Sequence, residues 1–345
     1  MFLPTFLCLM FPDIFASYCP CINPPIRKEW RTLSKGERVQ YIDAVKCLME
    51  KPPLMSQHII PGVTSRYEDF LGIHIVQADE VHFTGGFYPY HRLLLYLYEQ
   101  ELHTCGWPGG VPYWDWTLDN ANSTAFFNSP LFDDETGFGG NGKYIPGNVT
   151  HPANGVPPRN PDDFPDRTGG GCIQSGPFAN LTTHLGPGNS TDLNPHCVRR
   201  DFSPESFANR TGKAQIDDGM AQLDFGSFGR LTEPSFHAGG HWGIGGLYGD
   251  MTDKWSSPAD PLFYLHHANV DRAWWSWQSR DLENRTMDIS GPLIAFDFDN
   301  KVAGNLTLDH DMSLGVTNET TIKVKVQDVM HIQRGRLCYN YDKLY

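Results

Sequence analysis

The placement of six of the fourteen histidines in two sets of three most constrains how this chain can fold. His237 and His241 are four residues apart, the spacing that puts two side chains on one face of a helix. His82 and His91 would point to opposite sides of one continuous helix, because nine residues make about two and a half turns. Two glycines and a proline lie between them, so we expect the helix to break and both rings to converge. The predicted sets are His74, His82 and His91, and His237, His241 and His267.

The third member of the second set has to be chosen from two neighbours. His266 and His267 are adjacent, so at most one of them can face the same metal ion. Asp271 lies one helical turn after His267, where a carboxylate can accept a hydrogen bond from an imidazole N–H and fix the ring in its ligating tautomer. We therefore expect His267 to be a ligand, Asp271 to orient it, and His266 to lie behind the ligands or to serve in packing.

Six imidazoles without a supporting cluster of cysteines or acidic residues favour copper as the metal. Zinc also binds three histidines and a water, but it would need only one such set. Two coppers, each with three imidazoles and an open position, can exchange two electrons with O2 and an organic substrate. The formal charge of -13 and the lack of a basic run argue against nucleic acid as a partner.

The hydrophobic periodicity and the capping residues predict a mainly helical chain. Between residues 119 and 230 the sequence is rich in Gly, Pro, Asn and Asp, which predicts long surface loops rather than a domain boundary. Near the end, TIKVKVQDV alternates with period two and predicts a flanking strand. The predicted helices run from Ser34 to the Pro52–Pro53 pair, from Ser65 towards His82, from Tyr90 to His103, over residues 234–242, and from Asp260 onwards.

Three segments together resemble the two copper-binding signatures of tyrosinases and catechol oxidases: HFTGGFYPYHR from His82, HAGGH from His237 and DPLFYLHHANVD from Asp260. The chain is most similar to the short fungal members of this family. The similarity extends over KEWRTLS at 28–34, PYWDW at 112–116, HCVRRDF at 196–202 and Tyr-Asn-Tyr at 339–341. The resemblance implies a four-helix bundle around a dinuclear type-3 copper site, with long loops and a few flanking strands. It assigns the first histidine set to one copper and the second set to the other, with O2 as co-substrate.

The sequence departs from the family pattern at two positions near the histidines. Many fungal members have a cysteine two residues before the second histidine, linked to that ring through sulfur, whereas this chain has Glu80. After His237 it has Ala238, where strong tyrosinases often have an asparagine. Glu233 resembles the family's glutamate that orients a water in the active site, although it would also suit a helix N-terminus. We therefore expect no thioether, and catalytic roles for Glu233 and Ala238.

Several features predict secretion into an oxidising compartment. Residues 1–16 are apolar and resemble a signal peptide, which leaves residues 17–345 as one domain with no lid domain after Tyr341. No segment reaches the roughly 18 apolar residues that a membrane span needs. Eight Asn-x-Ser/Thr triplets predict glycosylation in the secretory or endomembrane lumen. Their asparagines are Asn122, Asn148, Asn180, Asn189, Asn209, Asn284, Asn305 and Asn318.

The eight cysteines suit the same compartment. We expect Cys172 to pair with Cys197, because they bracket a stretch rich in Gly, Pro and Asn. We also expect Cys47 to pair with either Cys19 or Cys21, which leaves an odd thiol if Cys8 is removed with the signal peptide.

These observations predict a copper oxidase that uses O2 to convert o-diphenols to o-quinones, with o-hydroxylation of monophenols as a lesser activity. Its partner would be a small phenol or catechol. The main alternative is a haemocyanin-like protein that binds O2 without turnover, since it would hold the same copper pair. A zinc hydrolase is a weaker alternative, because the sequence has no His-Glu-x-x-His motif.

Overall fold

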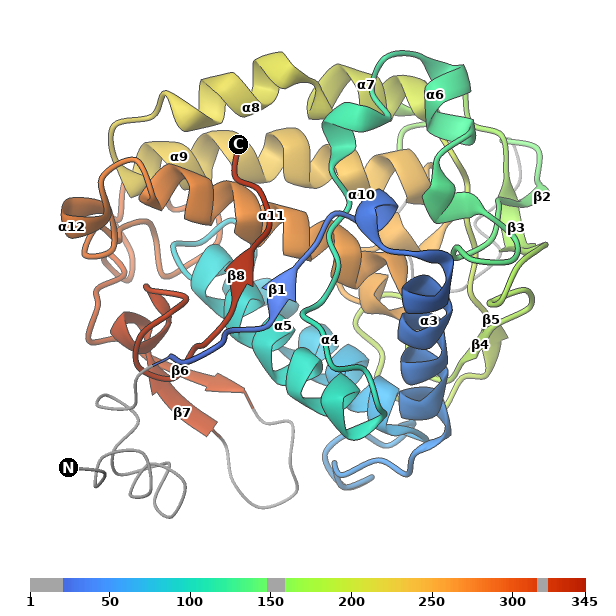
Figure 1. Cartoon of the computed structure of the whole chain (residues 1–345), viewed down its shortest axis with the longest axis horizontal. Helices are drawn as coiled ribbons and strands as arrows, with labels where there is room; N and C mark the ends of the chain where they lie inside the picture. Colours follow the sequence, from blue (N-terminus) through green and yellow to red (C-terminus); the bar gives the residue numbers. More distant parts are fainter. Residues whose placement is uncertain (1–20, 148–158, 315–321) are drawn as a thin grey trace.

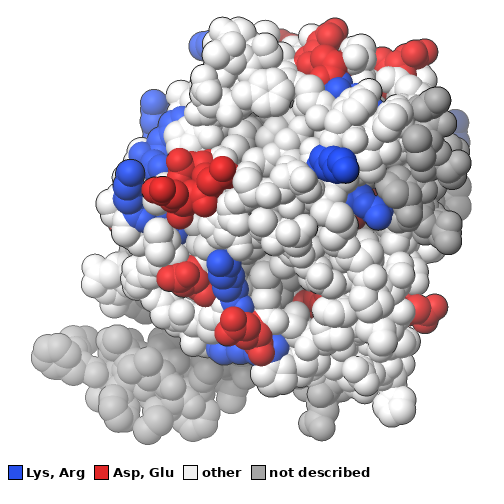
Figure 2. Space-filling model, turned by 90° about the vertical axis from the view of Figure 1, so that its right-hand side faces the viewer, with Lys and Arg blue, Asp and Glu red and all other residues white. Residues whose placement is uncertain are grey.

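The computed structural model describes residues 21–147, 159–314 and 322–345, and helices dominate it (Figure 1). The expected mainly helical fold with a few short strands is confirmed. The predicted signal peptide lies outside the described residues. Among the described residues no helix is both long enough and apolar enough to cross a bilayer. On the face shown in Figure 2, basic and acidic residues are scattered among uncharged ones.

Four helices carry the predicted histidines or directly adjoin them. They are α4 (Arg66–Val81), α5 (Phe87–Thr104), α10 (Ala238–Gly245) and α11 (Leu262–Gln278). Helix α4 contacts α5, α5 contacts α11, and α11 contacts α10. Every residue of α11 is buried, so this helix passes through the middle of the helical body, beside α5 in Figure 1. The arrangement brings sequence segments about 200 residues apart onto one interior.

The predicted helix starts are confirmed where the capping residue is adjacent in sequence to the helix. Helix α3 (Lys35–Glu50) begins with the predicted capping box of Ser34 and Glu37. At α4, Ser65 caps the backbone N–H of Glu68, whose own carboxylate accepts hydrogen bonds from Thr64 instead. Helix α5 begins at Phe87, earlier than the expected Tyr90, directly after the glycine pair.

The predicted fourth helix is wrong at its start. Helix α9 (Phe225–Thr232) already precedes Pro234, and a π-helical turn, η6 (Glu233–His237), joins α9 to α10. Ser235 in this turn has a non-helical backbone (φ −94°, ψ −108°). Pro234 has no N–H to donate, so it interrupts the regular hydrogen bonding of a longer helical segment rather than opening a new one. Turns of this type are frequent at functional sites.

The predicted loop region is only partly irregular. After residue 203 it forms α7 (Pro204–Thr211), α8 (Lys213–Met220) and α9, in addition to the short α6 (Ser123–Phe127). Helix α7 packs closely on α10, because a Cβ on Gly243 would lie only 2.7 Å from Cβ of Phe207. The prediction failed here because tertiary packing, rather than helix propensity, stabilises this short segment.

The strands form four two-stranded pairs among the described residues, at the flanks of the helical body. The predicted alternating strand is confirmed as β7, which then turns into a 3-10 helix. The pairs are β1 (Ile26–Arg27) with β8 (Asn340–Tyr341), β2 (Gly142–Tyr144) with β3 (Gly170–Ile173), β4 (Thr182–Thr183) with β5 (His196–Cys197), and β6 (Asp311–Leu314) with β7 (Ile322–Lys325). The remaining short helices are α12 (Leu282–Arg285), η2 (Trp30–Thr32), η3 (Trp116–Leu118), η4 (Pro130–Phe132), η5 (Pro161–Asp163), η7 (Asp250–Thr252), η8 (Ser257–Ala259) and η9 (Val326–Val329).

Three disulfides occur among the described residues. The predicted Cys172–Cys197 bond is confirmed. The predicted partner of Cys47 is wrong: Cys47 pairs with Cys105, because α3 packs against α5, and Cys21 pairs with Cys338. Cys8 and Cys19 lie outside the described residues.

A buried cluster of charges and phenols joins α5 and α11 to the β1–β8 pair. Asp271 on α11 accepts hydrogen bonds from Arg92 Nε (2.5 Å) and an Arg27 guanidinium nitrogen (3.1 Å). The hydroxyls of Tyr339 and Tyr341 donate to the same carboxylate, each at 2.6 Å. Burial would raise the pKa of Asp271, but the arginines and phenols hold it below its ordinary value. Glu99 also pairs with Arg27 at 2.8 Å, so Asp271 is the carboxylate partner of Arg92 and shares Arg27 with Glu99.

We predict that Asp271→Asn lowers the free energy of unfolding by about 3–5 kcal/mol, because it leaves a buried arginine charge without its partner. Urea denaturation followed by tryptophan fluorescence measures this change. Asp217→Asn is the matched control, since Asp217 pairs with Lys213 on the surface and should contribute less than about 1 kcal/mol. Equally small changes in the free energy of unfolding in both variants would show that the charge of Asp271 does not stabilise the fold.

Candidate metal centre

The first histidine set converges at the break between α4 and α5. His74 lies on α4, His82 directly follows its last residue, and His91 lies on α5. The ring centroids are 5.2 Å apart for His74 and His82, 5.6 Å for His74 and His91, and 5.1 Å for His82 and His91. All three are buried, and their ligand-capable nitrogens lie within 4.8 Å of one another.

The second histidine set forms around the π turn. His237 ends η6, His241 lies on α10, and His267 lies on α11. The ring centroid of His237 is 4.6 Å from that of His241 and 5.1 Å from that of His267. His266 belongs to the same group, whose ligand-capable nitrogens lie within 4.8 Å of one another. The structure thus brings the predicted set together and adds a fourth imidazole.

The two sets face each other across one interior. The rings of His91 and His267 stack at 4.3 Å, and those of His82 and His237 lie 6.2 Å apart. Phenylalanines that the sequence analysis missed line this interior, with Phe87 4.6 Å from His237. Another, Phe263, lies 4.1 Å from His267. The sequence does not distinguish aromatic residues that fill a core from those that line a site.

Backbone carbonyls orient five of the six rings. A carbonyl oxygen can only accept, so each bonded Nδ1 carries the proton and leaves the lone pair on Nε2. The bonds run from Nδ1 of His74 to Trp255 (2.7 Å), His82 to Ala78 (2.8 Å), His91 to Phe87 (2.8 Å), His237 to Glu233 (3.1 Å) and His241 to Met251 (2.6 Å).

The free Nε2 atoms fit a metal ion. Those of His74, His91 and His237 are buried and have no hydrogen-bond partner among the described residues. The Nε2 atoms of His241 and His267 lie 3.1 Å apart. Two imidazole lone pairs at this separation repel unless a proton or a cation lies between them. Buried polar atoms without partners destabilise a fold, so this arrangement is what a histidine-bound cation requires.

Burial keeps the imidazoles neutral. It lowers the pKa of His74 to about 4 and that of His241 to about 3, and it places the pKa of the other four histidines of the two sets well below 6.5. Neutral imidazole is the form that binds a metal, so no proton has to be displaced near neutral pH.

The predicted role of Asp271 is wrong. Its carboxylate accepts hydrogen bonds from the arginines and tyrosines of the buried cluster, and within the described residues no hydrogen bond joins it to His267 or His266. His266 lies flat against α10, where a Cβ on Gly240 would be 2.1 Å from its Nδ1, and it packs beside Trp116. The prediction failed because the partners of Asp271 come from distant segments of the chain.

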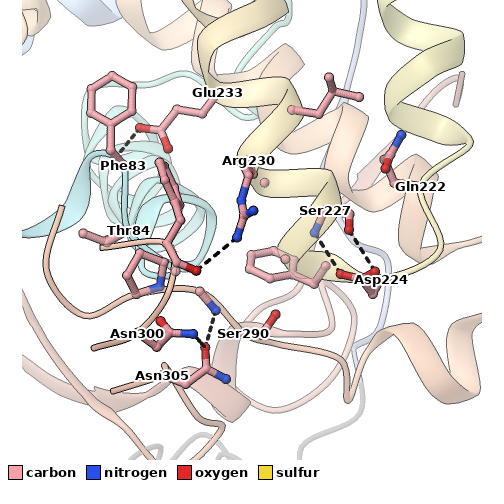
Figure 3. Close-up of a pocket in the computed structure, with 18 residues that line it drawn as sticks. Phe83, Thr84, Gln222, Asp224, Ser227, Arg230, Glu233, Ser290, Asn300 and Asn305 are labelled. Carbon is pink, nitrogen blue, oxygen red and sulfur yellow. Dashed lines mark hydrogen bonds between the residues drawn. The ribbon is translucent and has the colours of Figure 1, made fainter. Parts of the chain in front are cut away.

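Glu233 lies on the π turn between the histidines and a cavity. Its backbone carbonyl holds His237, and its Oε1 accepts a hydrogen bond from the N–H of Phe83 (2.7 Å; Figure 3). Burial raises the pKa of the Glu233 carboxyl well above its ordinary value. Ala238, directly after His237, is half-buried. Sequence reasoning missed Phe83, which has a left-handed backbone (φ +58°), an arrangement that has no sequence signal in a bulky residue.

Comparisons with known proteins agree with this geometry. Residues 64–280 match the common central domain of tyrosinase. Tyrosinase-like protein phomQ1 from Diaporthe leptostromiformis is 34% identical, over 93% of this chain and 78% of that protein. Tyrosinase P from Aspergillus terreus is 33% identical over 94% of each. A mutant form of polyphenol oxidase from Thermothelomyces thermophila superposes with a TM-score of 0.80 at 30% identity, over 98% of this chain and 94% of that one.

The chain therefore belongs to the tyrosinase family. It is a copper-dependent oxidoreductase, and its two buried histidine groups fit the family's dinuclear type-3 copper site, which works with O2. A functional unit of octopus haemocyanin, with a TM-score of 0.50 at 19% identity, shares only the fold.

We predict that His82→Ala and His241→Ala each lower the copper content from two ions to one per chain. Each variant removes one of the three histidines expected to bind the affected ion, so that ion loses a third of its expected protein ligands. Inductively coupled plasma mass spectrometry of the purified protein gives the number of copper ions per chain. His58→Ala, a change at an exposed histidine, is the control and should keep both ions. Full copper loading of the His82 and His241 variants would contradict the ligand assignment.

We predict that the metal-free protein loses stability as the solution is acidified from about pH 6.5 towards pH 4. The pKa of His74 is about 4 in the folded chain and about 6.5 in an unfolded one, so the unfolded state binds protons first. Above about pH 6.5 His74 is neutral in both states and does not lower the free energy of unfolding. Below that pH its protonation in the unfolded state lowers the free energy of unfolding progressively. Urea midpoints measured across this range test the sign, and a flat profile would contradict buried neutral imidazoles.

Proposed function

We propose that this protein oxidises o-diphenols to o-quinones with O2, using six histidines as the ligands of two copper ions. The first ion would be held by His74, His82 and His91, and the second by His237, His241 and His267. The observation that carries this assignment is the convergence of the two buried histidine groups, in which Nε2 of His74, His91 and His237 has no protein partner among the described residues. When bound, the copper pair supplies two-electron redox chemistry with O2.

The side from which a substrate reaches the centre follows from the burial of the rings. His74, His91 and His267 are 0–2% exposed, whereas His82, His237 and His241 are 5%, 7% and 8% exposed. We infer that the phenol approaches over His82, His237 and His241. Each catechol loses two electrons and two protons, and two catechols together reduce one O2 to two waters.

Glu233 is the group best placed to handle the proton of the substrate hydroxyl. One of its oxygens is occupied by the Phe83 N–H, and burial makes the ionised form a stronger base than an ordinary carboxylate. A water held by Glu233 would act as a base towards a monophenol only if a second polar group fixed it. Ala238 has no polar atom in its side chain. We therefore propose that oxidation of o-diphenols exceeds hydroxylation of monophenols.

Relatives of this chain support an aromatic substrate that carries a hydroxyl. One of them, 29% identical over 96% of this chain, is the N-acetyl-6-hydroxytryptophan oxidase ivoB from Emericella nidulans. The name of this relative gives a hydroxylated aromatic compound as its substrate, and we propose a small phenol or catechol for this chain.

We propose that the protein is secreted or lies in the endomembrane lumen, and that it is glycosylated. Its three disulfides among the described residues suit an oxidising compartment. Six of the eight glycosylation triplets are described, and all six asparagines are exposed: Asn122, Asn180, Asn189, Asn209, Asn284 and Asn305. The other two, Asn148 and Asn318, lie outside the described residues.

Turnover of 4-tert-butylcatechol by copper-loaded protein tests the proposed function. We expect continuous O2 consumption in an oxygen electrode together with quinone absorbance. A haemocyanin-like carrier would bind O2 reversibly and consume none beyond its copper content, and that result would replace the oxidase assignment.

We predict that Ala238→Asn raises the ratio of monophenol hydroxylation to diphenol oxidation, because an amide beside His237 can hold and polarise a water. Glu233→Gln should lower the ratio, because the amide is not a base. Both rates are measured on 4-ethylphenol and 4-ethylcatechol. If neither substitution moves the ratio, Glu233 and Ala238 do not control the reaction.

A further inference from the structure

A cavity of about 560 Å³ lies along α9, and two of its lining residues, Phe83 and Glu233, are neighbours of metal-centre histidines (Figure 3). Its volume is within the usual range of small-molecule sites. Glu233 and Phe83 form the end next to the centre, since Glu233 holds His237 through its carbonyl and Phe83 directly follows His82. A molecule whose ring lies at the centre could therefore place a substituent in this cavity.

Arg230 points into the cavity from α9, less than one helical turn before Glu233 (Figure 3). One guanidinium nitrogen donates to the carbonyl of Phe298 (3.2 Å), and the guanidinium lies 4.9 Å from the centre of the Phe298 ring. Within the described part of the chain, no carboxylate forms an ion pair with Arg230, and its other two nitrogens donate to no protein atom. Arg230 is exposed and makes these two contacts with Phe298, so its remaining N–H donors are accessible to a ligand in the cavity.

The acidic residues that line the cavity are engaged elsewhere. Asp224 caps α9, where its two oxygens accept from the backbone N–H and the hydroxyl of Ser227, at 2.8 Å and 2.9 Å. Glu233 accepts a hydrogen bond from the N–H of Phe83 at 2.7 Å. Arg230 is thus the one cation among the described lining residues, and the two acidic residues of the lining already accept hydrogen bonds from other groups.

The structure assigns Arg230 as a binding residue for a carboxylate on the substrate, so that acidic catechols are the preferred substrate class. This inference rests on the proposed function. A guanidinium presents several N–H donors that match a carboxylate, and such charge-assisted hydrogen bonds are stronger than neutral ones. Phe225 and Pro292 supply apolar walls for the carbon chain that joins the carboxylate to the ring.

The test compares dihydrocaffeate, a catechol with a propionate side chain, with 4-ethylcatechol, which lacks only the carboxylate. Steady-state KM and kcat are measured for both with the copper-loaded wild type, Arg230→Gln and Lys213→Gln. Lys213 is exposed on α8 and outside the cavity, so its variant removes the same charge from the molecule. Binding of both compounds to the copper-loaded proteins is also measured calorimetrically under nitrogen with the copper reduced to copper(I), which cannot accept electrons from a catechol.

We expect Arg230→Gln to raise KM and the anaerobic Kd for dihydrocaffeate about tenfold, with little change for 4-ethylcatechol and none in Lys213→Gln. An unchanged Kd for dihydrocaffeate, or equal losses for both compounds, would overturn the inference. The anaerobic measurement separates this result from the oxidase assignment. If the wild type binds dihydrocaffeate through Arg230 but oxidises neither catechol, the proposed oxidase function is wrong. The carboxylate-binding role of Arg230 would still be supported.

Discussion

The metal centre depends on one kind of hydrogen bond, from an imidazole Nδ1 to a backbone carbonyl. Because five rings make this bond, their Nε2 lone pairs are directed into one shared interior. For His82, His91 and His237 the carbonyl belongs to the residue four positions earlier, so the local helical backbone sets the ring. For His74 and His241 the carbonyls come from the segment before α11, so these rings are oriented only when that segment packs correctly.

The π turn connects the centre to the cavity beside it. The carbonyl of Glu233 accepts both the backbone N–H of Ala238 and the Nδ1–H of His237, while its carboxylate faces Phe83 and the cavity. A regular α-helix through Pro234 would rotate the residues after it and separate these roles. The same irregularity therefore positions a ligand ring, exposes a carboxyl to the substrate side and leaves Arg230, on the preceding helix, pointing into the cavity.

The sequence predicted most of the histidine centre, because i,i+4 spacing, capping boxes and glycine breaks are local signals that survive folding. It could not predict the partners of Asp271, since Arg27 is 244 residues away in the chain. The pairing of Cys47 with Cys105 depends in the same way on which helices pack together. The helices after residue 203 were missed because glycines on α10, such as Gly243, allow a close approach that only the folded chain reveals.

The central claim is that two ions are held by histidine nitrogens alone. X-ray absorption at the copper edge, combined with the metal content of the same sample, tests it most directly. We expect two coppers per chain, with the scattering pattern of imidazole rings and no sulfur contribution, since Glu80 stands where many fungal relatives have a cysteine. A copper–sulfur contribution, a single copper per chain, or zinc in active protein would contradict it.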